Sequence, residues 1–157
     1  MPAAAAAPVV TQADRPLRVE TALGTDALLL HGLAGEEAVS RPFRFTLELS
    51  AGGALVPDAD ALLGTPACVA VRLPSGGERL VHGLVSRFRR KASGVVVDGY
   101  EAELVPWLWM LSLSADCRIY QQKSVPEIVA GVFDEMGYAD YRVALVKTYE
   151  PREYCVQ

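Results

Sequence analysis

The chain has 157 residues, of which 51% are hydrophobic and 22% charged, and its formal net charge is −4 at pH 7. This is the length of one ordinary domain with room for a sizeable core, and the composition excludes a disordered or fibrous chain. The negative charge argues against nucleic acid or an anionic membrane surface as the main partner. No apolar run approaches the roughly 20 residues that cross a bilayer, which predicts a soluble protein without stable membrane insertion.

Residues 1–16 begin with a run of alanine and proline and then become polar. They lack the basic start and the leucine-rich stretch of a secretory signal, so the general secretory route is not indicated. We expect a disordered arm here.

Three apolar runs follow the arm. Residues 17–23 and 27–33 flank a glycine-containing turn, which predicts a β-hairpin, and a loop is expected at 35–37. Residues 43–50 then show the cleanest alternation of apolar and polar side chains in the chain, typical of a strand with one buried face. The apolar members of this strand are Phe43, Phe45, Leu47 and Leu49.

Residues 51–66 are rich in turn formers and predict a loop with one helical turn at 60–63. Three strands joined by short turns follow and predict a β-meander; they are 67–73, 79–88 and 95–105, with the Pro74-Ser75-Gly76-Gly77 turn between the first two and a charged tip at 89–94 between the last two. Six strands in all predict a mainly-β fold, a small antiparallel barrel or sandwich. The barrel is favoured because closure leaves no unprotected edge.

The chain changes character after Pro106. Residues 107–113 are too apolar to face water, and we expect them to plug the mouth of the barrel or to pack beneath the segment that follows. Residues 117–123 are expected to be an extended connection.

A helix is predicted next. Ser124 is placed to cap it, Glu127 to reach back to the Ser124 amide, and Gly137 to end it. Residues 141–146 alternate again, and 152–157 begin a further strand. The predicted organisation is thus a disordered arm at 1–16, a β-barrel at 17–113, and a helix with an incomplete second β unit at 114–157, which we expect to continue in a longer protein or to dock another chain.

We expect no catalytic, cofactor-binding or metal-binding residues. The two histidines, His31 and His82, have no carboxylate or thiolate partners at ligand spacing, so a structural role is expected for both. The three cysteines fit neither a zinc motif nor a disulfide framework, and we expect free thiols in a reducing compartment; they are Cys68, Cys117 and Cys155.

Five motifs, in this order and at these separations, resemble the N-terminal region of the VgrG spike proteins of bacterial type VI secretion systems, which is itself similar to the tail-hub protein of contractile phages. The motifs lie at 40–45 (SRPFRF), 82–85 (HGLV), 106–111 (PWLWML), 118–128 (RIYQQKSVPEI) and 151–157 (PREYCVQ).

The resemblance implies a structural hub rather than an enzyme. It implies a homotrimer in which two barrels per subunit form a pseudo-sixfold ring, matching a hexameric inner-tube protein on one side and leading to a needle on the other, with baseplate components and effectors as further partners. It also implies assembly in the cytoplasm and export by the type VI apparatus without a signal peptide.

The candidate subunit contacts are the surplus apolar side chains after the barrel and two arginines near the charged tip. They are Trp107, Trp109, Leu111, Tyr141, Val143, Leu145, Arg89 and Arg90.

Two other interpretations remain open from the sequence. The basic tip at 87–91 contains Phe88 on a small barrel, a composition shared with OB-type modules that bind single-stranded nucleic acid. Alternatively, the chain is a folded remnant of a spike gene without a function of its own.

Overall fold

The computed structural model describes residues 10–52, 55–91 and 99–156. The chain divides into two compact units, Met1–Leu113 and Ser114–Gln157. The first unit holds the strands β1 (Leu17–Glu20), β2 (Leu28–Ala38), β3 (Arg41–Ala51), β4 (Pro66–Arg72), β5 (Glu78–Arg90) and β6 (Gly99–Val105), and the 3-10 helix η1 (Trp107–Leu113). The second holds β7 (Ile119–Lys123), the helix α1 (Val125–Glu135) and β8 (Arg152–Val156).

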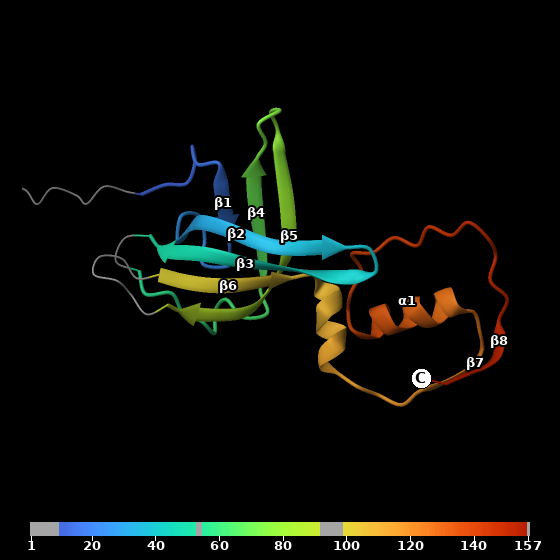
Figure 1. Ribbon diagram of the computed structural model, residues 1–157. Coiled ribbons are helices and arrows are strands. Elements are labelled where there is room, and N and C mark those ends of the chain that lie inside the picture. Colours follow the sequence, from blue (N-terminus) through green and yellow to red (C-terminus); the bar gives the residue numbers. More distant parts are fainter. Residues whose placement is uncertain (1–9, 53–54, 92–98, 157) are drawn as a thin grey trace, which may run out of the picture. The chain divides into compact units, whose positions relative to one another are not determined.

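The six strands of the first unit form one antiparallel sheet in the order β1-β4-β5-β6-β3-β2. In Figure 1, β1, β4 and the first half of β5 run steeply across β2, β3 and β6, so the sheet curls over on itself. Strand β5 forms the corner, because its first half pairs with β4 and its second half with β6. A β-bulge between Val85 and Arg87 lies in the second half, and bulges bend a strand and increase its twist.

The core lies between the two halves of the curled sheet. Alternation along each strand sends every second side chain inward, as in β3, where Phe45, Leu47 and Leu49 are buried as predicted. The mainly-β fold class and the meander of β4, β5 and β6 are confirmed. Residues 92–98, which include part of the predicted tip and of the last predicted strand, lie outside the described residues.

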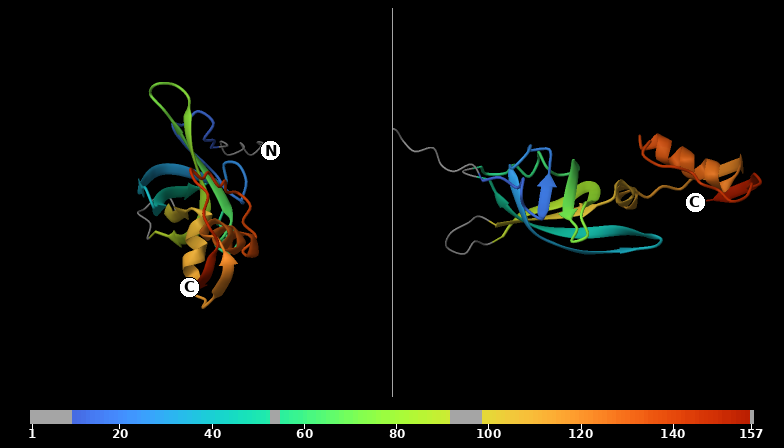
Figure 2. Two further views of the ribbon diagram at one scale, coloured as in Figure 1. Left: turned by 90° about the vertical axis from the view of Figure 1, so that its right-hand side faces the viewer. Right: turned by 90° about the horizontal axis from the view of Figure 1, so that it is seen from above.

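The predicted hairpin of 17–23 with 27–33 is wrong. Strand β1 pairs with β4, and β2 pairs with β3. The two strands that this turn connects, β1 and β2, are therefore the two edge strands in the order of the sheet. Each pairs with a strand further along the chain, and local turn signals do not encode that choice. The loop expected at 35–37 is also wrong, because Gly35 and Glu36 pair with Phe45 and Arg44 and extend the β2–β3 hairpin. Seen from above, this hairpin reaches further than the other strands of the sheet (Figure 2).

The segment after Pro106 was predicted to plug the mouth of the barrel, but Leu62 occupies the core instead. Leu62 belongs to the helical turn predicted at 60–63. It is 1% exposed, and the amides of Leu62 and Leu63 both donate to the carbonyl of Ala59. None of the residues of η1 is buried, so η1 is no plug of the barrel mouth.

Gln12 joins the two edge strands of the sheet. Its side chain is 3% exposed; its Oε1 accepts the amides of Val19 in β1 (3.0 Å) and Leu30 in β2 (3.2 Å), and its Nε2 donates to the Val19 carbonyl (2.9 Å). The Gln12 amide in turn donates to the carboxylate of Asp26 (2.8 Å). The arm predicted at 1–16 therefore extends too far, because residues from Gln12 onward are bound to the sheet.

The second unit pairs β7 with β8 beside α1. The helix begins as predicted: the Glu127 carboxylate accepts the Ser124 amide (2.7 Å) and hydroxyl (2.6 Å). It ends at a Schellman motif in which Gly137, at φ +76°, donates to Asp134 and Tyr138 donates to Phe133. The strand predicted at 141–146 is wrong, since these residues join no ladder, whereas β8 confirms the strand predicted at the end of the chain.

No helix among the described residues combines the length and the apolar character that crossing a bilayer requires.

Candidate assembly interface

Two basic side chains of the tip are paired with carboxylates on neighbouring strands. The Arg89 Nε donates to Glu101 on β6 (2.8 Å), and the Lys91 Nζ donates to Glu48 on β3 (2.9 Å). The ring of Phe88 stacks on the buried Tyr100, with 5.4 Å between centroids, and so faces the core. A nucleic-acid surface needs unpaired cations and an exposed aromatic face for base stacking. The described part of the tip offers neither at these residues, which disfavours the nucleic-acid interpretation.

The segment η1 carries the first group of predicted contact residues. In a 3-10 helix, residues i and i+3 align, so Trp107, Met110 and Leu113 form one row, while Trp109 and Leu111 lie on other sides. Leu113 is 62% exposed, and the other two members of the row are half-buried. The predicted contact surface covered the whole stretch 107–113. Of the three residues singled out in it, Trp107 alone belongs to this row, because the sequence gave no helix type.

The second group of predicted contact residues lies in the second unit. One of them contacts its own unit, and the other two are exposed. Tyr141 is used within the unit: its ring meets Phe133 edge-on at 4.9 Å, and its hydroxyl donates to Asp134 (3.2 Å). Burial and the Asp134 carboxylate raise the pKa of Tyr141. Val143 and Leu145 are about half exposed, at 51% and 52%. They remain candidates for contact with another chain, as does the exposed Arg90 at the end of β5.

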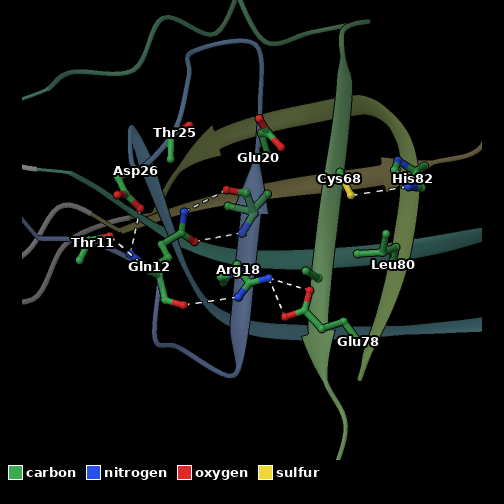
Figure 3. Close-up of a pocket in the computed structure, with 13 residues that line it drawn as sticks. Thr11, Gln12, Arg18, Glu20, Thr25, Asp26, Cys68, Glu78, Leu80 and His82 are labelled. Carbon is green, nitrogen blue, oxygen red and sulfur yellow. Dashed lines mark hydrogen bonds and ion pairs between the residues drawn. The ribbon is translucent and has the colours of Figure 1, made fainter. Parts of the chain in front are cut away.

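A hollow of about 640 Å³ lies on the outer face of β1, β4 and β5 (Figure 3). Its wall includes Gln12 and Asp26, and the Cys68 thiol lies 3.8 Å from the His82 Nε2. Burial, and to a lesser extent the charge of Glu20, raise the pKa of Cys68, so its thiol stays protonated at neutral pH. An activated cysteine needs the opposite shift. The sequence missed this hollow because β1 was assigned to a different partner strand.

The histidines have structural contacts. The His31 Nε2 lies 2.7 Å from the Ser50 hydroxyl, at a β-bulge of β2. Among the described residues, no three histidine, cysteine, aspartate or glutamate side chains form a group that could hold a metal ion. The three cysteines are free.

Residues 36–157 match the family model described as phage tail baseplate hub (GPD). The chain belongs to this family. The resemblance to VgrG spike proteins is confirmed as well. The chain is 40% identical over 147 residues to the type VI secretion system spike protein VgrG1c of Pseudomonas aeruginosa, a match that covers 94% of this chain and 20% of the relative. It is 45% identical over 126 residues to VgrG5 of the same organism, covering 78% of this chain and 15% of the relative.

One solved structure is also similar. It is the E. coli c3393 protein, described as a component of the type VI secretion system with structural similarity to the T4 bacteriophage tail proteins gp27 and gp5. The TM-score is 0.65 at 25% identity, and the match covers 83% of this chain and 38% of that one. The chain spans about a fifth of the length of the curated spike proteins VgrG1c and VgrG1a.

Proposed function

We propose that this chain is a structural component of a type VI secretion spike, in which it forms the hub. The observation that carries the proposal is the hub-family match over residues 36–157, together with 40% identity to a named spike protein over 94% of the chain. The relatives are named as spike and tail-hub proteins, which are structural roles. We therefore assign no enzymatic function to the chain.

Self-assembly is the finer part of the proposal, with three copies in the complete protein. The row of Trp107, Met110 and Leu113 on η1 supports it, because large apolar side chains that a unit leaves half or fully exposed are typical of protein interfaces. In the second unit, Val143 and Leu145 are the corresponding candidates. Arg89 and Arg90 are the remaining candidates, and Arg89 pairs with Glu101 on the neighbouring strand.

The proposed partners follow from the family. They are a hexameric inner-tube protein, baseplate components and effectors, and the proposed route is assembly in the cytoplasm followed by export through the type VI apparatus.

The test is the mass of the complete protein in solution, measured by size-exclusion chromatography with light scattering. We expect three copies for the wild type and dissociation for Leu113→Ser, because it places a hydroxyl in the apolar row. Leu63→Ser is the matched control, since Leu63 is 42% exposed and lies outside the row. A monomeric wild type contradicts self-assembly, and equal loss of assembly in both variants contradicts the assignment of the interface to η1.

A further inference from the structure

We propose that the hollow on the outer face of β1, β4 and β5 binds an extended segment of a partner protein in which an apolar residue and an arginine or lysine lie two positions apart. The residues that line the hollow belong neither to η1 nor to the second unit, so this inference does not depend on the self-assembly surface.

The floor of the hollow consists of two cross-strand rows. In the first row, Arg18 lies opposite Ala70, and Ala70 lies opposite Leu80. In the second row, two residues further along each strand, Glu20 lies opposite Cys68, and Cys68 lies opposite His82. The residues between the rows, Val19, Val69 and Val81, are buried in the core, so both rows face outward. Leu80 is 54% exposed and provides apolar area that the fold leaves uncovered.

The charges in the hollow favour a cation. Its lining contains the three carboxylates of Glu20, Asp26 and Glu78 and the single guanidinium of Arg18. Arg18 is already paired, since its Nη2 lies 2.6 and 2.7 Å from the two carboxylate oxygens of Glu78. This pair shows that a guanidinium fits a carboxylate at one end of the hollow (Figure 3).

Glu20 is the carboxylate that remains available. Among the described residues it forms no hydrogen bond or ion pair, and its neighbours Cys68 and His82 bring no carboxylate or guanidinium of their own. The Asp26 carboxylate, in contrast, accepts the Gln12 amide. A cation supplied by a partner therefore finds its counter-charge at Glu20.

The spacing of the rows sets the pattern of the partner. Equivalent residues of the two rows are two positions apart on one strand, which corresponds to about 6.6 to 6.8 Å. An extended partner segment has the same repeat on one face. An apolar side chain over Ala70, in contact with Leu80 on the next strand, therefore places the side chain two residues away over Cys68. The neighbour of Cys68 on β1 is Glu20, which a long arginine or lysine side chain reaches.

The test is an NMR titration of the ¹⁵N-labelled protein with the tripeptide amide acetyl-Leu-Ser-Arg. Two matched peptides, acetyl-Leu-Ser-Glu and acetyl-Ser-Ser-Arg, each remove one of the two recognised features. We expect saturable shifts at the amides of β1, β4 and β5 with the first peptide, in the millimolar range up to about 10 mM, and weaker binding of both controls.

Two protein variants and two controls complete the test. Glu20→Gln and Leu80→Ser each weaken binding of the first peptide by about three- to fivefold, the range of a single exposed contact. Glu153→Gln and Leu63→Ser, at exposed positions that do not line the hollow, leave it unchanged. The proposal is overturned if the arginine and glutamate peptides bind equally, or if no shifts appear in the hollow. It is also overturned if shifts appear there without peptide as the protein concentration rises, because a second copy is then the occupant.

Discussion

Replacing Gln12 by alanine should open the contact between β1 and β2. The substitution leaves the Val19 amide, the Val19 carbonyl and the Leu30 amide without their partner, and all three bonds are buried. Each unpaired group costs roughly 1.5 kcal/mol, and alanine avoids about 1.5 kcal/mol of side-chain ordering, so the net loss in free energy of unfolding is about 3 kcal/mol.

The assay is urea denaturation of the first unit, followed by the fluorescence of Trp107 and Trp109, with hydrogen exchange of the Val19 and Leu30 amides as a local readout. Gln121→Ala is the matched control, because Gln121 is exposed on β7 and its loss should change stability by less than about 0.5 kcal/mol. If Gln12→Ala unfolds at the same urea concentration as the control and both amides keep their protection, Gln12 does not join the edge strands.

Further substitutions test the local structure. Gly83→Ala should destabilise the first unit by about 1 to 3 kcal/mol in urea denaturation, because the new Cβ would lie 2.5 Å from the Val105 carbonyl oxygen. Gly131→Ala is the matched variant: its Cβ would lie in open space on α1, so it should stabilise the helix by about 0.5 to 1 kcal/mol. Equal effects of the two substitutions on stability would refute this reasoning. Ser124→Ala should cost the second unit about 1 kcal/mol in thermal melts followed by circular dichroism, and an unchanged melt would argue against the cap. The Gln12 amide, and then the Thr11 hydroxyl, hold the pKa of Asp26 below its ordinary value of 3.8. The stability that this carboxylate contributes is therefore complete above pH 3.8 and lost as the pH falls through the lowered pKa, so Asp26→Asn should flatten the acid limb of a stability profile, and a limb as steep as that of the wild type would count against this role.

The parts of the fold that follow from short-range patterns were predictable. Alternation in residues 43–50 identified the buried face of β3, the Pro74 to Gly77 turn identified the β4–β5 hairpin, and Ser124 with Glu127 identified the start of α1. Each of these signals lies within one element or one turn.

The features that depend on long-range pairing were not predictable. Strand β1 pairs with β4, about 50 residues later in the chain, and no local residue encodes that choice. Gln12 lies in a stretch whose composition predicts a disordered arm. Its hydrogen bonds to Val19 and Leu30 exist only because the fold brings the edge strands β1 and β2 close together. Residues 141–146 alternate like a strand but have no neighbouring strand among the described residues, so alternation alone does not produce a ladder.

The candidate interface was predictable only in outline. The surplus of apolar residues after Pro106 indicated a surface, but the helix type that aligns Trp107 with Met110 and Leu113 emerged from the structure. The neutralisation of Arg89 by Glu101 also required the register between β5 and β6. In this pair the second side chain lies on a neighbouring strand, which the sequence does not indicate directly.

Cryo-electron microscopy of the complete protein shows whether this chain is the hub of a self-assembling spike. We expect a threefold particle in which residues 107–113 lie in a contact with another subunit. Single, unassociated particles with this segment facing solvent would contradict it.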